Sequence, residues 1–238
     1  MKPIQHINHA LPINTPPVDF KPMSDDERAA YQNDYLERSL AQSARDKFDQ
    51  FCPKALHPKS TMLNHPDLAH NAEAISSIVN WKDKGDGKGL LICGPTGTGK
   101  TRIELVLAER LMCQSPRHDV AYYTSHQFFA KLQDQITYGC DHADEFIETV
   151  ARRKHLFIDD LGQQALVTAR APWANSRFFQ LLDIRMGLQL PLFITTNLTA
   201  EQLIAGADPI QADPMLRRLL ALGHPVHFKV GNVRAHSV

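Results

Sequence analysis

The sequence has few cysteines, no long apolar run and no excess of either charge. Its cysteines, Cys52, Cys93, Cys113 and Cys140, are far apart and form no C-x-x-C pair. This spacing argues against a disulfide framework and against a zinc site, and it favours reduced thiols in a cytoplasmic protein. No stretch approaches the ~20 apolar residues that span a bilayer. No basic segment leads into an apolar run at the start of the chain, so we expect no signal peptide.

Basic and acidic residues balance at 26 each, which gives a formal net charge of +0. No global charge therefore points to a nucleic-acid or membrane partner, and any such contact needs a local patch. The histidine pairs His65 with His70 and His224 with His227 lack cysteine or carboxylate neighbours at metal-ligand spacing. We expect no histidine-based metal centre. A chain of 238 residues can form one large domain, or a core domain with an appendage.

One stretch, residues 94–101, fits the phosphate-binding pattern G-x-x-x-x-G-K-[ST] at every fixed position. The apolar residues 89–93 before it predict a buried strand, and the apolar spacing over 102–112 predicts a helix. Backbone N–H groups and the helix dipole at such a junction favour bound phosphate. We therefore expect a nucleotide site formed by Gly94, Pro95, Thr96, Gly97, Thr98, Gly99, Lys100, Thr101 and Arg102. Lys100 is expected to reach the β- and γ-phosphates of ATP, and the Thr101 hydroxyl to bind Mg²⁺.

The segment before this site divides in two. Residues 1–22 are rich in Pro, Asn and His, and we expect a flexible arm. Ser24 and Glu27 fit a capping box, which predicts a helix that continues to about Phe51. The apolar stripe of this helix is narrow. The stripe either packs on the main domain or faces a partner protein. We treat residues 23–64 as an N-terminal helical extension and a candidate partner-docking region.

Buried strands alternate with amphipathic helices over residues 65–238, which demands a parallel sheet covered on both faces. We expect strands over residues 89–93, 120–125, 155–158, 190–196 and 225–230. We expect helices over residues 68–81, 102–112, 127–136, 145–153, 176–186, 199–205 and 214–222. Few residues follow the last of these strands, so we expect no clear C-terminal helical lid over the nucleotide.

Polar side chains follow two of these strands directly. Asp159 and Asp160 end an apolar strand, where ligands of open α/β sheets collect. Asp159 is expected to hold Mg²⁺, and Asp160 to orient or polarise an attacking water. The alternative is a pair of solvated loop carboxylates. Asn197 ends the next strand, and its neutral amide can bond the γ-phosphate or the water without charge repulsion, although Thr-Thr-Asn also forms ordinary turns.

In this order, residues 94–101, 156–162 and 194–198 resemble the Walker A, Walker B and sensor I motifs of AAA+ ATPases. The resemblance is closest to the DnaC/IstB branch of helicase loaders and transposition helper ATPases, whose Asp-Asp Walker B pair this sequence reproduces. Trp173 and residues 178–185 support that branch. The resemblance covers roughly residues 65–235. It implies an α/β P-loop NTPase of the AAA+ (ASCE) class: a three-layer sandwich with a central, mostly parallel sheet, here with an N-terminal helical extension.

The same resemblance implies an ATP-dependent homo-oligomer in which an arginine finger reaches a neighbour's nucleotide. Arg218 matches the family pattern better than Arg217, although Asp213-Pro214 departs from that pattern one turn earlier. A planar cation there would stabilise charge on the transferred phosphoryl group; the alternative is a solvated helix face. We expect Arg185 to be structural or intersubunit. Arg234 is a further candidate for a phosphate or interface contact.

The resemblance also implies that residues 126–154 grip single-stranded DNA. The candidate contacts are Lys131, Arg152, Arg153 and Lys154. Aromatic residues beside cations suit base stacking, but Phe128 and Phe129 are equally suited to the core, and nearby acidic residues offset the positive charge.

The leading interpretation is an ATP-hydrolysing replication protein that loads a replicative helicase onto single-stranded DNA. An IstB-like helper that acts with a transposase is the alternative, because the partner choice depends on the N-terminal region. A small-molecule kinase would need an arginine-rich lid, which the sequence lacks. A nucleotide-gated binding module with negligible turnover is a fourth interpretation.

Overall fold

The computed structural model describes residues 23–52, 70–114, 119–137, 142–162, 172–199 and 214–230. The chain divides into two units, Met1–Ser39 and Leu40–Val238. Helix α1 (Asp25–Phe51) begins in the first unit. The Ser24 hydroxyl accepts the Glu27 backbone N–H at 3.2 Å, and the Glu27 carboxylate accepts the Ser24 N–H at 2.8 Å. This reciprocal pair is the predicted capping box.

The apolar stripe of α1 is divided between two environments. Ala44 and Phe48, which belong to the second unit, are 0% and 1% exposed and lie in that unit's core. Tyr31 and Tyr35, in the first unit, are both 64% exposed, and Leu36 is exposed as well. The end of the helix therefore packs on the main domain, whereas its first half keeps an apolar surface in solvent.

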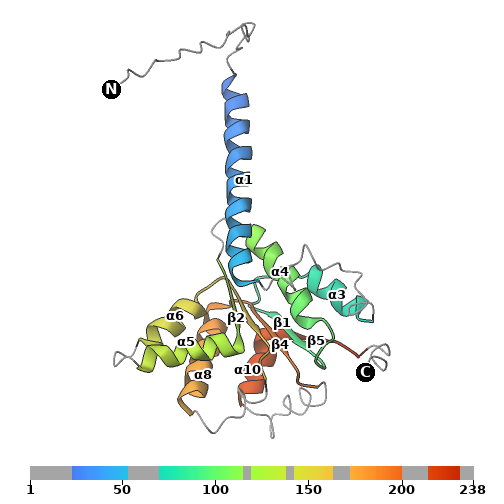
Figure 1. Ribbon diagram of the computed structural model, residues 1–238, viewed down its shortest axis with the longest axis vertical. Helices are drawn as coiled ribbons and strands as arrows, with labels where there is room; N and C mark the ends of the chain where they lie inside the picture. The colour runs from blue at the N-terminus through green and yellow to red at the C-terminus, as the bar shows by residue number, and fades with distance from the viewer. Residues whose placement is uncertain are drawn as a thin grey trace, which may run out of the picture. The chain divides into compact units, whose positions relative to one another are not determined.

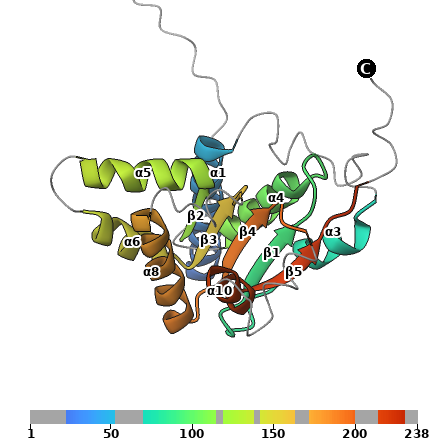
Figure 2. The same ribbon diagram turned by 90° about the horizontal axis from the view of Figure 1, so that it is seen from below.

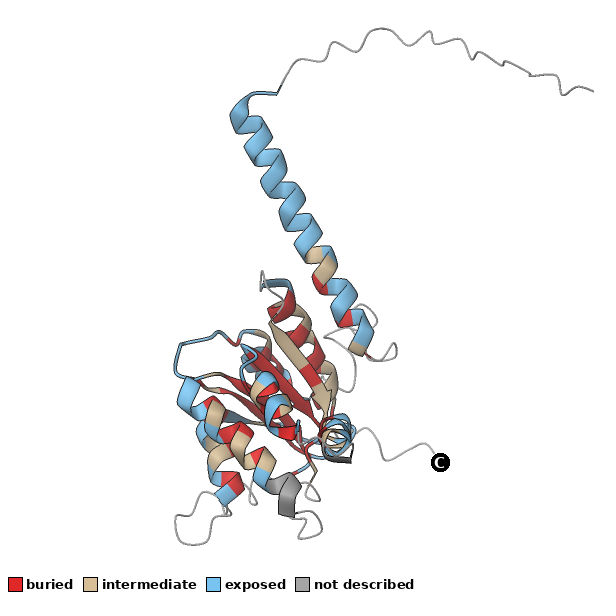
Figure 3. Ribbon diagram, turned by 90° about the vertical axis from the view of Figure 1, so that its left-hand side faces the viewer, coloured by how far each residue is buried: buried red, intermediate tan, exposed pale blue. Residues whose placement is uncertain are grey.

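Five parallel strands form one sheet in the order β2-β3-β4-β1-β5 (Figure 1). They are β1 (Gly89–Cys93), β2 (Val120–Thr124), β3 (His155–Asp159), β4 (Leu192–Thr196) and β5 (Gly223–His227). The three central strands are buried along their whole length, whereas the two edge strands are partly exposed (Figure 3). Continuous apolar runs in the central strands follow from burial on both faces.

Helices cover both faces of the sheet (Figure 2). One face carries α3 (Ala72–Val79), α4 (Lys100–Gln114) and the end of α1. The other carries α5 (Ser125–Thr137), α6 (Ala143–Ala151), α8 (Pro172–Leu188) and α10 (Pro214–Leu222). Alternate residues of β1 enter opposite cores, Leu90 and Ile92 one, Leu91 and Cys93 the other. The expected three-layer α/β sandwich with a parallel sheet is confirmed.

Some boundaries differ from the expected ones. β5 begins at Gly223 and ends at His227, earlier than the expected 225–230, and it contains Pro225. An edge strand tolerates proline because one side needs no ladder bond. Helix α8 begins at Pro172, four residues before the expected Ser176, because proline suits the first turn. The predictions for residues 1–22, for the 199–205 helix beyond Thr199 and for Arg234 lie outside the described residues, as does the side chain of Trp173.

Arg185 lies inside the main domain and is 0% exposed. It donates hydrogen bonds to the carbonyls of Ala151 and Arg153 at 2.9 and 2.8 Å, and to that of Pro191. Burial lowers the pKa of Arg185 to about 9. The guanidinium ties the end of α6 to the turn before β4, which fits the structural role and excludes an intersubunit contact.

The cysteines among the described residues, Cys52, Cys93 and Cys113, are free thiols, as expected. Burial raises the pKa of Cys93 to about 12. The described part of the chain contains no group of three or more metal-ligating side chains. It also contains no helix that is both long enough and apolar enough to cross a membrane.

Candidate nucleotide site

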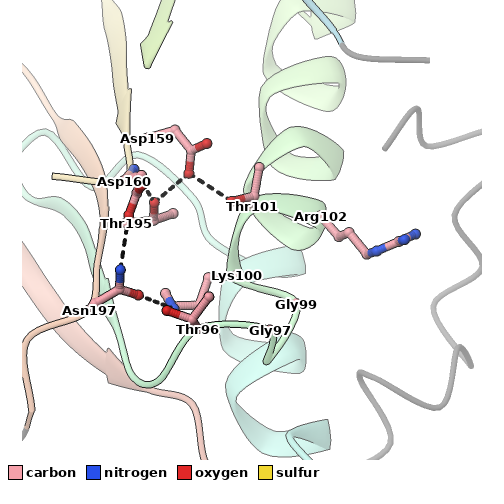
Figure 4. Close-up of a pocket in the computed structure, with 10 residues that line it drawn as sticks. All are labelled: Thr96, Gly97, Gly99, Lys100, Thr101, Arg102, Asp159, Asp160, Thr195 and Asn197. Carbon is pink, nitrogen blue, oxygen red and sulfur yellow. Dashed lines mark hydrogen bonds between the residues drawn. The ribbon is translucent and has the colours of Figure 1, made fainter. Parts of the chain in front are cut away.

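A cavity of about 500 Å³ lies where α4 begins beside the carboxyl ends of β3 and β4 (Figure 4). Its volume is in the usual range for small-ligand sites. The residues that line it are Thr96, Gly97, Gly99, Lys100, Thr101, Arg102, Asp159, Asp160, Thr195 and Asn197. Side chains from all three sequence motifs therefore meet in one place. Arg102 points away from the two carboxylates (Figure 4).

The loop over residues 94–99 bends sharply at its start. Gly94 has φ of +141°, and a Cβ there would lie 2.3 Å from the carbonyl oxygen of Phe228. The N–H of Phe228 in turn donates to the Cys93 carbonyl at 2.7 Å. Only glycine fits both this conformation and this close approach. The Thr98 hydroxyl donates to the Pro95 carbonyl at 2.9 Å and holds the loop closed.

Lys100 is buried beneath this loop. Its ammonium donates to the carbonyls of Gly94 and Pro95 at 2.7 and 2.8 Å, and to Asn197 Oδ1 at 3.0 Å. Burial lowers the pKa of Lys100, and the carboxylates of Asp160 and Asp159 oppose that shift. These carboxylates keep a positive charge favourable at the point where phosphate oxygens are expected.

One carboxylate oxygen of Asp159 accepts hydrogen bonds from two hydroxyl groups. Thr101 Oγ1 donates to Asp159 Oδ1 at 2.9 Å, and Thr195 Oγ1 donates to the same oxygen at 2.5 Å. Asp159 is also buried, at 6% exposed. A hydroxyl and a carboxylate at this distance are hard oxygen donors of the kind that Mg²⁺ prefers. Thr101 and Asp159 thus fit the metal role expected of them.

Asp160 stands in the left-handed region, with φ of +54°, which costs a residue other than glycine of order 1–3 kcal/mol. Three contacts hold it there. Its N–H donates to Thr195 Oγ1 at 2.7 Å, its carbonyl accepts the Ser125 hydroxyl at 2.7 Å, and its Oδ1 accepts Asn197 Nδ2 at 3.1 Å. Asn197 therefore bridges Lys100 and Asp160, with its oxygen on the cation and its amide nitrogen on the carboxylate (Figure 4).

A further carboxyl group, Glu104, lies buried next to this site. It is 0% exposed, and neither of its oxygens has a hydrogen-bond partner among the described residues. Burial and the negative charge of Asp159 raise the pKa of Glu104 well above its ordinary value. Sequence reasoning missed Glu104, as it missed Thr195 and Ser125. A polar residue four positions after Lys100, on the apolar face of its helix, was the available signal for Glu104.

The two finger candidates lie apart from the residues that line this cavity. Arg218 donates to Asp183 at 2.6 Å, and its guanidinium lies 4.8 Å above the ring of Phe179. Arg217 is exposed, and both arginines line a second cavity, with Met186, between α8 and α10. The structure thus brings Lys100, Asp160 and Asn197 together but not Arg218.

Three of the four candidate DNA contacts have partners within the described part of the chain. Lys131 lies 5.3 Å above the ring of Tyr123. Arg152 pairs with Glu148 at 2.8 Å, and Arg153 with Asp119 at 3.6 Å. Lys154 is exposed.

The aromatic residues of the same segment divide between core and surface. Phe128 is 0% exposed in the core beneath α5, and Phe129 is partly buried against it. The core alternative therefore holds for Phe128, which has no surface for base stacking.

The sequence profile of the IstB-like ATP binding proteins matches residues 54–237. Among proteins with curated functions, no relative matches the sequence. Several solved structures share the fold. The DnaC helicase loader is 18% identical with a TM-score of 0.56, over 74% of this chain and 98% of that one. DnaI is 21% identical with a TM-score of 0.53, over 75% of this chain and 95% of the DnaI chain. AMPPCP-bound DnaA from Aquifex aeolicus is 16% identical with a TM-score of 0.55, over 76% of this chain and 52% of that one.

Proposed function

Because the chain belongs to the family of IstB-like ATP binding proteins and has the AAA+ fold, we propose that it is a Mg²⁺-dependent ATPase that loads a replicative helicase onto single-stranded DNA. The observation that carries the ATPase part is the meeting of Thr101, Asp159 and Lys100 in one cavity, with Asp160 and Asn197 opposite. A site that only binds the nucleotide would not require the second carboxylate, that of Asp160.

The motif residues of the cavity divide the tasks of ATP hydrolysis between them in this proposal. Lys100 and the backbone N–H groups of residues 94–101 bind the phosphates. Thr101 and Asp159 hold Mg²⁺, which neutralises phosphate charge when bound. Asp160 orients the attacking water and accepts its proton, because its carboxylate is aimed by the Asn197 amide at 3.1 Å. Asn197 gives this alignment without adding a negative charge near the phosphates.

A second copy of the chain completes the site in this proposal. Arg218 would reach the neighbour's nucleotide after exchanging Asp183 for phosphate oxygens, which a planar guanidinium binds well. The rate of ATP hydrolysis per chain is then expected to rise with protein concentration. Arg218→Ala should remove that rise, and Arg217→Ala is the matched comparison on the same helix. A rate per chain that is independent of concentration would contradict the shared site.

The partner part of the proposal rests on the exposed first half of α1. Tyr31, Tyr35 and Leu36 present apolar area that a partner protein can cover. We propose a helicase as this partner because solved structures with the same fold include the DnaC helicase loader. The family name favours the alternative, a transposase, as IstB-like proteins are the family matched.

The full-length chain can decide between these partners. It is mixed in turn with the replicative helicase and with the transposase of its own cell, with ATP and single-stranded DNA present. The triple Tyr31→Ala, Tyr35→Ala, Leu36→Ala variant should lose the partner and keep ATP turnover, whereas Glu37→Ala should keep both. A chain that hydrolyses no ATP would overturn the enzymatic part. Association with the transposase alone would replace the loader with the transposition helper.

Binding of single-stranded DNA is assigned to Lys131, Arg152, Arg153 and Lys154 in this proposal. Each phosphate contact contributes a salt dependence of about −0.7 in the slope of log K against log[salt] for single strands. Replacing Arg152 by Ala should remove one phosphate contact, so the slope should become shallower by about 0.7. ATP binding should be unchanged. An unchanged slope would remove Arg152 from the DNA-binding surface.

A further inference from the structure

We propose that Thr195 is a positioning residue that sets the orientation of both carboxylates, Asp159 and Asp160, through one hydroxyl group. This inference rests on the proposed ATPase function and adds a residue to its site. Thr195 lines the cavity and is 1% exposed (Figure 4). It would bind neither phosphate nor water, and it would act through the two aspartates.

The sheet register brings Thr195 to this place. Strands β3 and β4 pair in parallel with Ile158 opposite Ile194, so the next residues, Asp159 and Thr195, lie on adjacent strands. A threonine hydroxyl has one proton to donate and can accept another bond. Both capacities are used, since Oγ1 donates to Asp159 Oδ1 at 2.5 Å and accepts the Asp160 N–H at 2.7 Å.

The first of these bonds limits how Asp159 can turn. Oδ1 of Asp159 receives hydroxyl protons from both Thr101 and Thr195, so the carboxylate is held from two sides. Rotation about its side-chain torsions would break at least one bond. Groups that hydrogen-bond a metal-binding carboxylate fix its direction, and their loss typically costs about 10–100-fold in metal affinity or activity.

The second bond supports the unusual backbone at Asp160. With φ of +54°, this residue leaves the extended path of β3, and its N–H no longer continues the strand ladder. Thr195 accepts that N–H, while the Thr195 carbonyl accepts the N–H of Leu161 at 2.8 Å. Thr195 thereby fixes the turn that aims the Asp160 side chain into the cavity. One hydroxyl links the direction of the metal ligand to the direction of the water-orienting carboxylate.

Thr196, the next residue, provides a matched control. It is also 1% exposed, and its hydroxyl also makes two hydrogen bonds, donating to the Leu161 carbonyl at 2.7 Å and accepting the Leu198 N–H at 3.3 Å. Both of its partners are backbone groups, and neither is a carboxylate. Loss of either threonine hydroxyl should therefore cost similar stability, while only Thr195 should affect Mg²⁺ and the aspartates.

The experiment compares Thr195→Val, Thr195→Ala, Thr195→Ser and Thr196→Val in the full chain. For Thr195→Val and Thr195→Ala we expect kcat to fall about 10–100-fold and the Mg²⁺ concentration for half-maximal turnover to rise by a similar factor. The KM for ATP should change little, because Lys100 and the loop are untouched. Thr195→Ser keeps the hydroxyl and should restore both quantities to near wild type.

Two further readouts do not require turnover. Mn²⁺ binding with a non-hydrolysable ATP analogue, measured by electron paramagnetic resonance, should weaken in Thr195→Val and Thr195→Ala only. Hydrogen exchange of the Asp160 amide, measured by NMR, should accelerate in the same two variants, because the N–H has lost its acceptor. Thr196→Val should match wild type in both measurements.

The outcomes separate this inference from the proposed function. Thr195 variants that match Thr196→Val in Mn²⁺ affinity and in Asp160 exchange would overturn the positioning role. So would a Thr195→Ser variant as impaired as Thr195→Val, because the hydroxyl would then be irrelevant. If the wild-type chain binds Mn²⁺ and nucleotide but hydrolyses nothing, the ATPase proposal fails while these two measurements still judge Thr195.

Discussion

Replacing Asn197 by aspartate tests whether the neutral amide between Lys100 and Asp160 is needed for ATP turnover. Asn197 Nδ2 lies 3.1 Å from Asp160 Oδ1, and Asn197 Oδ1 lies 3.0 Å from Lys100 Nζ. The substitution turns the amide donor that faces Asp160 into a second carboxylate oxygen. It also turns the neutral acceptor on Lys100 into a charged one, which gives the variant an ion pair.

The size of the repulsion follows from the distance. Two unit charges about 3 Å apart interact by roughly 1 to 5 kcal/mol between the dielectric of water and that of a protein surface. Asn197 and Asp160 are both exposed, so the lower part of that range applies, about 1–2 kcal/mol or roughly a factor of 5–30. The new ion pair with Lys100 offsets this cost in the folded protein, but it competes with the phosphates for the ammonium.

The assay compares Asn197→Asp with Asn197→Ala, which loses both hydrogen bonds and gains no charge. We expect both to fold, and Asn197→Asp to turn over ATP about 5–30-fold more slowly than Asn197→Ala. The difference should narrow as salt is raised, because exposed charges are screened. An Asn197→Asp variant as active as Asn197→Ala, or a difference that salt does not change, would refute the reasoning.

Two further predictions concern groups outside the cavity. Burial lowers the pKa of His155 from 6.5 to about 4. The unfolded chain therefore binds the proton more readily than the folded chain. The contribution of neutral His155 to the free energy of unfolding is full above pH 6.5, and it falls as the pH drops from 6.5 towards 4. The loss is about 3 kcal/mol, and it should be absent from denaturant titrations of His155→Gln across that range; an equally steep loss in the variant would contradict the assignment. Arg185→Leu leaves several buried carbonyls without a donor and should lower the free energy of unfolding by about 3–5 kcal/mol, whereas Arg152→Leu, which breaks an exposed pair with Glu148, should cost no more than about 1 kcal/mol. Equal effects of the two arginine substitutions in thermal or denaturant melts would remove the structural role of Arg185.

Much of the fold could be predicted because its strands are short apolar runs bounded by polar residues. Residues 89–93 form β1 as expected, and residues 214–222 form α10 as expected. The apolar pattern placed the start of β5 two residues too late, because Gly223 and His224 carry no apolar signal. Pairing with β1 decides where that strand begins. Tertiary pairing there overrides local propensity.

The site was predictable where a motif fixes residues close in sequence, and less so where contacts cross between strands. The positions of Lys100 and Thr101 follow from the loop pattern. Thr195 is hydrogen-bonded to Asp159 and Asp160, which lie 36 and 35 residues earlier in the sequence. These bonds depend on the register of two strands, and no local sequence pattern reveals that register. The pairing of Arg218 with Asp183 likewise joins two helices, and a charge pattern alone does not distinguish it from a solvated arginine.

Asp160→Asn tests the central claim, that this cavity hydrolyses ATP and does not only bind it, most directly. The substitution keeps the size of the side chain and leaves Lys100, Thr101 and Asp159 in place, so the affinity for a fluorescent ATP analogue with Mg²⁺ should match wild type. Turnover of ATP by the same preparation should fall at least about 100-fold. Unaffected turnover in Asp160→Asn, with nucleotide binding intact, would contradict the role given to Asp160 and with it the account of hydrolysis.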